Sequence, residues 1–284
     1  MLYNYLHDPS AIAGSVILVI AVSAAILAPW ITPQDPYNLA EVSLEYFLTP
    51  PLWMEEGQAP FILGTDDQGR CIFSTIIYGC RTSLIVGFSV VLFTGTFGVL
   101  MGLLTGFYGG KLDAFIMRVA DTIYAFSTTL LALMFLGIFG KGSVLLVILA
   151  ICIAGWVRYA RTMRGSVLEI KQEAYIMAAK ATGAGDFRLL MRHLLPNAIP
   201  PIFVIVAVDL AVVIMIEATL SFLGVGVPLT EPSLGMMVAI GKNYVYAGMW
   251  WMIVFPGTAL ILLVVGINLF ADWLREELNP KIER

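Results

Sequence analysis

The sequence contains little charge and almost no histidine. Charged residues make up 13% of the chain against 59% apolar residues, a balance far from that of soluble globular domains. The two histidines, His7 and His193, lie far apart, so no His/Cys cluster with metal-ligand spacing exists. No Gly-x-x-x-x-Gly-Lys-Ser/Thr phosphate-binding loop occurs either. The low content of charge indicates a membrane protein. The missing phosphate-binding loop assigns any nucleotide binding to a different chain.

Cysteine is also scarce, with three in the chain. Cys71 and Cys80 lie in a region expected outside the membrane, where a disulfide is conceivable, but nine residues of helix would hold their sulfurs too far apart. Cys152 lies within an apolar segment and is most simply a packing residue. We expect three unpaired thiols. No nucleophile or metal constellation is visible, so the sequence predicts neither a catalytic nor a metal site.

Six segments are long and apolar enough to cross a hydrocarbon core about 30 Å thick as helices, each needing about 20 residues. They lie near 11–29, 84–107, 117–139, 142–163, 199–222 and 249–271. The first is predicted to be an uncleaved anchor, because residues 1–10 contain no Lys or Arg and its apolar run exceeds that of a signal peptide. The chain is therefore predicted to be an all-α polytopic membrane protein with six transmembrane helices.

Two loops of opposite charge assign the sides of the membrane. Residues 31–83 carry seven acids against Arg70 and Arg81, whereas 158–197 carry seven of the sixteen Lys and Arg residues. By the positive-inside rule the basic loop is cytoplasmic and the acidic loop lies outside. An even number of spans then places both termini in the cytoplasm, in agreement with Arg275, Lys281 and Arg284 near the C-terminal end. The expected segments are 1–30 with the first span, the outer loop 31–83, a five-helix core 84–272 that includes the basic loop, and the tail 273–284.

Two further helical features are expected. Between 66 and 81 apolar residues recur at helical spacing, which predicts an interfacial helix leading into the second span. Within that span four glycines recur at every fourth position and line one face: Gly98, Gly102, Gly106 and Gly110. Small residues at this spacing let another helix approach closely in lipid. We therefore predict a tight helix contact along this face.

Asp209 and Glu217 both fall within the fifth predicted span, where an acid near the centre costs about 2.5 to 3.5 kcal/mol on insertion scales. One interpretation places them on a polar pathway that contacts a charged substrate or its amino group. The other is a buried acid paired with Arg118, Lys242 or a partner subunit. The second is favoured for Glu217, which lies near the outer end, where we expect water to reach it; for Asp209 both stay open. Arg118 and Asp121 are also spaced to form an i,i+3 pair.

The basic loop begins with three arginines at regular spacing. Arg158, Arg161 and Arg164 recur every third residue, so we expect them to continue the fourth span as a helix that emerges into water and anionic headgroups. Further along, Asp186 is expected to cap another helix, 187–195, which Pro196 ends.

Between these two helices lies a short run of small residues. It is expected to form a helix with Tyr175, Ala178, Ala179 and Thr182 on one side, and to stop at Gly183-Ala-Gly185. A short helix held between two turns is suited to a groove on another protein. The alternative is an amphipathic loop lying on the headgroups, which explains the apolar residues at 187, 189 and 190 but not the Ala/Gly-rich tip.

Several motifs, spread over nearly the whole chain, resemble one transporter family. The run Ala178-Ala-Lys-Ala-Thr-Gly183, followed by Leu194-Leu-Pro196-Asn, is similar to the EAA loop of permease subunits in binding-protein-dependent ABC importers. Further matches are Leu63-Gly-Thr-Asp-Asp-Gln-Gly-Arg70, Ser221-Phe-Leu-Gly-Val-Gly226, Asn268-Leu-Phe-Ala-Asp272 and Leu278-Asn-Pro280. Together they resemble the C-type permease of the dipeptide, oligopeptide and nickel importers.

Three positions depart from the pattern of that family. Met177 stands where the EAA motif usually has its glutamate, Cys71 where Gly-Arg-Asp has its aspartate, and Leu234 where Trp-Gly has its tryptophan. The salt bridge usually expected at 177 cannot form, and Glu173, one turn earlier, is the candidate substitute.

The resemblance implies a type I ABC importer permease fold with a cytoplasmic coupling helix, forming half of a pathway for peptides across a bacterial inner membrane. Its implied partners are a second permease subunit, two cytoplasmic ATPase subunits that bind ATP and Mg, a periplasmic or extracellular substrate-binding protein and membrane lipid. Nucleic acid and a cofactor of the chain itself are not expected. The residues implied to contact the ATPase are Glu173, Ala174, Tyr175, Met177, Ala178, Ala179, Gly183 and Ala184.

Other functions remain as alternatives. Within the importer class the runner-up substrate is nickel or a metal chelate. A secondary transporter would need paired inverted repeats or broken spans with charges near the midplane, and only the fifth span has acids. A membrane-embedded enzyme would need a catalytic constellation, and none is visible.

Overall fold

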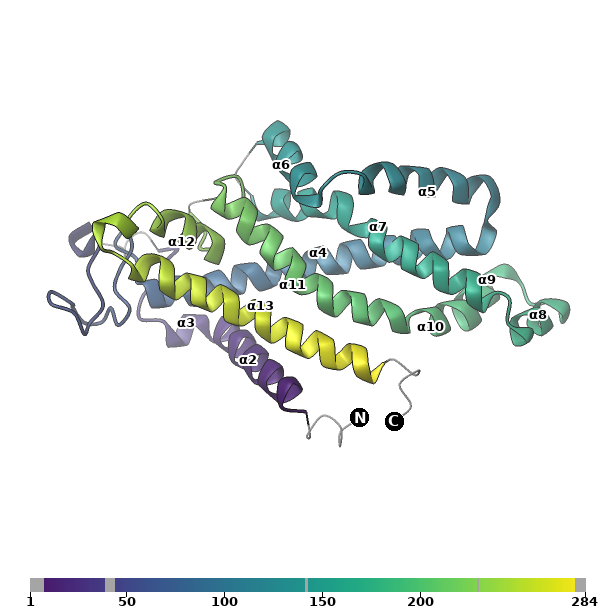
Figure 1. Ribbon diagram of the computed structural model, residues 1–284, viewed down its shortest axis with the longest axis horizontal. Coiled ribbons are helices and arrows are strands. Elements are labelled where there is room, and N and C mark those ends of the chain that lie inside the picture. The colour runs from purple at the N-terminus through teal and green to yellow at the C-terminus, as the bar shows by residue number, and fades with distance from the viewer. Residues whose placement is uncertain (1–7, 39–43, 141–142, 229, 279–284) are drawn as a thin grey trace.

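Long helices that run side by side form the body of the molecule (Figure 1). The computed structural model describes residues 8–38, 44–140, 143–228 and 230–278. The motif residues Asn279 and Pro280 and the basic Lys281 and Arg284 lie outside the described residues. The long helices are α2 (Pro9–Ile26), α4 (Ile72–Tyr108), α7 (Val144–Ile170), α11 (Pro200–Phe222) and α13 (Trp251–Glu277).

Shorter helices connect or extend these. They are α3 (Ala28–Ile31), α5 (Gly110–Tyr124), α6 (Thr128–Phe139), α8 (Ala174–Ala181), α9 (Asp186–Arg188), α10 (Leu195–Ala198), α12 (Leu234–Gly241), the 3₁₀ turns η1 (Leu44–Tyr46) and η3 (Val245–Ala247), and the π-helix η2 (Leu189–Leu194).

Five helices of the described chain are each long and apolar enough to span a membrane, and α5 and α6 meet the same test only together. These two are bent by 87° at the break between Tyr124 and Thr128. The sequence Gly110–Tyr124 contains two acids and two bases, whereas α6 is uncharged, so only the second half is suited to lipid on all sides. The predicted all-α membrane fold is confirmed, with five continuous candidate spans, and the predicted third span consists of two helices that meet at this bend instead of one straight helix.

The helix α4 is 37 residues long, about 55 Å at 1.5 Å per residue, and so extends well beyond a hydrocarbon core of about 30 Å. It begins at Ile72 and runs without a break into the second span. The prediction of a separate interfacial helix at 66–81 is therefore wrong. Its first residues form a turn, and the apolar period seen from 72 onward belongs to the spanning helix itself.

Three of the four regularly spaced glycines make the contact between α4 and α7. A Cβ atom on Gly98 would lie 2.5 Å from the Trp156 carbonyl oxygen, and one on Gly102 only 2.4 Å from the Ala160 carbonyl oxygen. A Cβ on Gly106 would lie 2.8 Å from the Val167 side chain. Gly110 differs, because it starts α5 with φ +60° and has open space around its Cβ position. The predicted helix contact is confirmed for three glycines, while the fourth forms the turn between helices.

At the edge of the bundle α2 lies beside α13 (Figure 1). A Cβ on Gly14 would be 2.8 Å from the Leu269 Cβ, so glycine is required for this approach. α2 begins and α13 ends towards the end of the molecule that α8 occupies, whereas α12 and the loop before α4 lie at the opposite end (Figure 1). The two ends of the bundle therefore carry the two regions singled out in the sequence.

Candidate coupling loop, membrane cavity and outer turn

The short helix α8 projects at one end of the bundle (Figure 1). Glu173 is its N-cap, and Thr182 is its C-cap. Only Ile176 is buried, while Tyr175 and Met177 are 46% and 58% exposed. The remaining predicted contact residues are exposed or half-buried: Glu173, Ala174, Ala178, Ala179, Gly183 and Ala184. The predicted docking residues therefore lie together on an accessible tip.

Gly183 ends this helix through its backbone conformation. Its φ is +84°, in the left-handed region that residues with a Cβ rarely adopt, although nothing lies within 4 Å of the Cβ position. Its N–H donates to the Lys180 carbonyl, and the N–H of Ala184 donates to the Ala179 carbonyl, so the last turn of α8 is closed in the usual way. Glycine is therefore favoured here by its backbone conformation and not by crowding.

Two contacts hold α8 against the spanning helices. Ile176 packs with Val167 of α7 and Leu190 of η2 in one hydrophobic cluster. Lys171, directly after α7, donates from Nζ to the carbonyl oxygens of Gly106 at 3.3 Å and Phe107 at 3.0 Å, at the end of α4. A cation at this position satisfies carbonyls that a helix end leaves free. α8 therefore packs on α7 through Ile176, and the residue that ends α7 also contacts the end of α4.

The chain after α8 differs from the prediction. Gly185, not Asp186, is the N-cap of the next helix, and the segment 189–194 forms a π-helix. Pro196 does not end this segment, because it occupies the first turn of α10, where a missing N–H has no cost. Helical backbone thus continues almost to the start of α11.

The half of α7 nearer to α8 is joined to α5 by two ion pairs. Arg164 donates to both carboxylate oxygens of Asp113, at 2.6 Å and 2.7 Å. Arg161 donates to Asp121 at 2.6 Å and lies over the Tyr124 ring, 4.3 Å from its centroid. The guanidinium groups predicted to face water and anionic headgroups are therefore engaged with acids of the same chain.

The expected pair between Arg118 and Asp121 is also wrong. Asp121 instead accepts from Arg161, which follows it by 40 residues. Residues three apart on one helix are always close, but here the facing helix offers a donor with better geometry. Whether Asp121 pairs with Arg118 or with Arg161 therefore depends on how α5 and α7 approach each other.

Asp209 lies on α11 beside a cavity of about 240 Å³. Its partner is Arg158 of α7, whose Nη1 donates to the Asp209 carboxylate, and neither Arg118 nor Lys242 takes this role. The Asp209 side chain is 7% exposed and that of Arg158 is 48% exposed. Both line the cavity, together with Ser127 and Thr128 from the break between α5 and α6. Asp209 is therefore a paired acid, with Arg158 in place of the expected partners, and it also lines a cavity.

Glu217 is fully buried, so the expectation that water reaches it is wrong. It accepts hydrogen bonds from the hydroxyls of Ser221 at 2.8 Å, Ser233 at 2.9 Å and Ser83 at 3.0 Å. These serines come from α11, the N-cap of α12 and α4. Glu217 therefore joins three helices, and it is not among the residues that line the Asp209 cavity.

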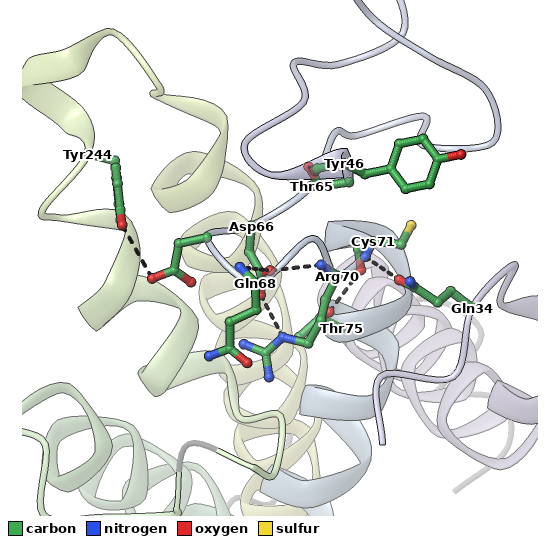
Figure 2. Close-up of polar contacts among 10 residues, drawn as sticks. Gln34, Tyr46, Thr65, Asp66, Gln68, Arg70, Cys71, Thr75 and Tyr244 are labelled. Carbon is green, nitrogen blue, oxygen red and sulfur yellow. Dashed lines mark hydrogen bonds and ion pairs between the residues drawn. The ribbon is translucent and has the colours of Figure 1, made fainter. Parts of the chain in front are cut away.

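At the other end of the molecule the motif at 63–71 forms a tight structure, which we call the outer turn (Figure 2). Asp66 Oδ1 accepts from the backbone N–H of Gln68 and of Arg70, each at 2.9 Å, and its Oδ2 accepts from Arg70 Nε at 2.7 Å. Both charged side chains are buried. The N–H of Cys71 donates to Gln34 Oε1 at 2.6 Å. The outer turn therefore positions the start of α4.

Asp67, next to this network, contacts the corner after α12. The Tyr244 hydroxyl lies 3.4 Å from Asp67 Oδ2, a long hydrogen bond. Burial raises the pKa of the Asp67 carboxyl, and the neighbouring charge of Asp66 raises it further. The outer turn thus includes one carboxylate with a weak partner.

Comparison with known proteins identifies the family. Residues 98–284 match the model of the binding-protein-dependent transport system inner membrane component, and residues 1–51 match the N-terminal TM domain of oligopeptide transport permease C. The chain belongs to the first of these families. It is a multi-pass inner-membrane permease, a transport component rather than a catalytic subunit, of a system that includes a substrate-binding protein and an ATPase.

The permease is similar to named relatives over nearly its whole length. It is 37% identical to the di/tripeptide transport system permease protein DppC of Pseudomonas aeruginosa, covering 99% of this chain and 91% of the relative. It is 36% identical to the dipeptide transport system permease protein DppC of Haemophilus influenzae, with 99% and 94% covered. The probable D,D-dipeptide transport system permease protein DdpC of Escherichia coli is 36% identical, with 96% and 88% covered.

A solved structure shares the fold. The MetNI methionine ABC transporter, in an inward-facing conformation, aligns with a TM-score of 0.58 and 20% identity over 72% of this chain and 96% of that chain. The predicted fold, that of a type I ABC importer permease, is therefore confirmed.

The structure shows where the three departures from the family pattern lie. Cys71 is the N-cap of α4, and its side chain makes no capping hydrogen bond, which an aspartate would supply. Leu234 is buried, and the glycine after it is retained because a Cβ on Gly235 would lie 2.4 Å from the Ala218 carbonyl oxygen. Met177 is exposed on α8, on the tip that also carries Glu173.

Sequence reasoning missed Arg158 and Lys171 as functional candidates. The sequence places Arg158 in a run of arginines expected to face water and headgroups, and Lys171 only among the bases of the loop. A signal was present for Arg158, because its position within the fourth predicted span requires a partner acid. No comparable signal existed for Lys171, whose acceptors are backbone carbonyls.

Proposed function

We propose that this chain is one of two permease subunits of an importer for short peptides and forms half of the pathway through the membrane. Two separate ATPase subunits, which bind ATP and Mg, drive the cycle, and a substrate-binding protein delivers the peptide. The observation that carries this proposal is α8, whose small, exposed residues project from the spanning helices on a tip held by Lys171 and Ile176. The relatives named for dipeptide and tripeptide transport support peptide as the substrate over nickel.

The proposal assigns the α8 end of the bundle to the cytoplasm. The basic loop favours this side, and α2 begins and α13 ends towards the same end of the bundle (Figure 1). Both termini are then cytoplasmic. The outer turn and the corner after α12 face the binding protein.

Closure of the ATPases on ATP would push α8 and tilt the helices attached to it. Lys171 transmits this movement to α4, and the ion pairs of Arg161 and Arg164 carry α5 along with α7. One wall of the Asp209 cavity comes from α7 and another from the α5–α6 break. Movement of α5 and α7 relative to α11 would therefore open and close this cavity. Such opening and closing is the alternating access that import requires.

Substitution of Gly183 tests the docking role of α8. The importer is reconstituted in liposomes with its partner permease, ATPases and binding protein, and peptide import and ATP hydrolysis are measured together. Because φ is +84° at Gly183, we expect Gly183→Val to distort the end of α8, leave membrane insertion intact and uncouple hydrolysis from uptake. Gly185→Val is the matched control, since Gly185 has φ −68° and is equally uncrowded. Normal import by Gly183→Val would contradict the docking assignment.

A further inference from the structure

The ion pair between Arg158 and Asp209 differs from the other ion pairs of α7. Arg164 binds both oxygens of its acid, and Arg161 is held by an acid and an aromatic ring. Arg158 makes one hydrogen bond within the described residues, from Nη1, and 48% of its side chain remains exposed. A guanidinium carries five N–H donors, so most of its capacity for hydrogen bonding is unused.

The unused donors face a cavity. Arg158 and Asp209 are the charged members of the described cavity lining, which is otherwise aromatic, aliphatic or small, with two hydroxyls from the α5–α6 break. Its volume of about 240 Å³ lies below the roughly 300–1,000 Å³ of complete small-molecule sites, as half of a site shared with a second subunit would. One positive and one negative group therefore stand side by side on an apolar wall.

A peptide with free ends has the complementary pair of charges. Its ammonium group donates to a carboxylate, and its terminal carboxylate accepts two parallel hydrogen bonds from a guanidinium. Two extended residues span about 7 Å, so the two ends engage Asp209 and Arg158 only if the arginine side chain swings away from the acid. Its half-exposed, flexible side chain permits this movement.

We propose that Arg158 and Asp209 form a recognition site for the two ends of a short zwitterionic peptide, with Asp209 binding the ammonium group and Arg158 the carboxylate. The inference rests on the proposed function. Before the peptide arrives and after it leaves, the two side chains pair with each other. Each charge is therefore compensated at every stage, which avoids the large cost of an isolated charge in the membrane.

The test measures binding of a radiolabelled dipeptide, alanyl-leucine, to the complete importer in nanodiscs without the binding protein, so that selection by that protein does not contribute. Competitors are unlabelled alanyl-leucine, its N-acetyl derivative and its C-terminal amide. We expect the wild-type complex to prefer the free dipeptide over each blocked form by at least about tenfold, the value of one charge-assisted hydrogen bond.

The variants separate recognition from stability. Asp209→Asn is expected to lose the preference for a free amino group and keep that for a free carboxylate, and Arg158→Gln is expected to do the reverse. The double variant leaves no unpaired charge and is expected to lose both preferences. It can still be measured if either single variant misfolds. Asp113→Asn with Arg164→Gln removes another ion pair of α7 and keeps both preferences.

Import of the same dipeptide into liposomes, with binding protein and ATP, is measured in parallel. Absence of import by the wild type would contradict the proposed function. Import without detectable binding at millimolar dipeptide, or variants that keep the wild-type order of competitors, would overturn the recognition site alone.

Discussion

Arg164 of α7 donates two parallel hydrogen bonds to Asp113 of α5, from Nε at 2.6 Å and from Nη2 at 2.7 Å. The two residues are 51 positions apart. This pair joins the helix that leads to α8 with the first half of the broken span, and the broken span forms part of the cavity wall. It is therefore a direct mechanical link between the proposed ATPase contact and the proposed pathway.

Removal of this link is expected to weaken coupling without preventing assembly. A half-exposed ion pair contributes about 1 kcal/mol, so Arg164→Gln should lower peptide import per ATP hydrolysed by roughly fivefold. Import and hydrolysis in liposomes measure the ratio. Asp113→Asn should have a similar effect, and the double variant should be no worse than either single one, because both remove the same interaction. Strictly additive losses would show that the two residues act separately.

Glu217 is expected to be a structural residue. Glu217→Leu leaves three serine hydroxyls without their buried acceptor, and we expect a loss of about 3 kcal/mol in unfolding free energy. Glu217→Gln keeps the size and one acceptor oxygen and should lose about half as much. Thermal unfolding of the purified permease in detergent compares the two. If both variants unfold like the wild type but fail to transport, Glu217 acts in the pathway instead.

The N-cap of α4 offers a stabilising substitution. Cys71 makes no capping hydrogen bond, whereas a serine hydroxyl of similar size can accept from an N–H of the first turn. We expect Cys71→Ser to stabilise the protein by about 0.5–1 kcal/mol, seen as a higher midpoint of thermal unfolding. Cys80→Ser, within the helix, is the control and should give no increase. An equal increase in both would indicate that loss of the thiol, not capping, is responsible.

Asp67 predicts a pH-dependent contribution to stability. Its pKa is raised in the folded state, so the folded protein binds this proton more tightly than the unfolded chain does. Stability from this group is greatest below the unfolded pKa and is lost as the pH rises through the folded pKa. Asp67→Asn should therefore raise the unfolding midpoint at about pH 7, and the gain should shrink as the pH falls towards about 4. Glu55→Gln, an exposed acid in the same loop, is the control; a gain for Asp67→Asn that is independent of pH would exclude this cause.

The sequence by itself determined the membrane class, the approximate positions of five spans and the loop that carries α8. These depend on hydropathy, on the spacing of small residues and on turn glycines. Each of these properties is visible in residues that lie close together in the sequence. Gly98, Gly102 and Gly106 were recognisable as a packing face for this reason. Gly183 was recognisable as a helix stop, although its positive φ was not.

The tertiary structure decided which charges meet. Arg158 and Asp209 are 51 residues apart, and Ser83 and Glu217 are 134 apart. Helical periodicity assigns each of these residues to a face of its own helix but not to the helix that lies opposite. The three arginines of α7 therefore looked like a solvated basic stripe, and only the approach of α5 and α11 showed that each has a partner acid. The charged helix α5 shows the same dependence, because its two acids are paired only where α7 supplies Arg161 and Arg164.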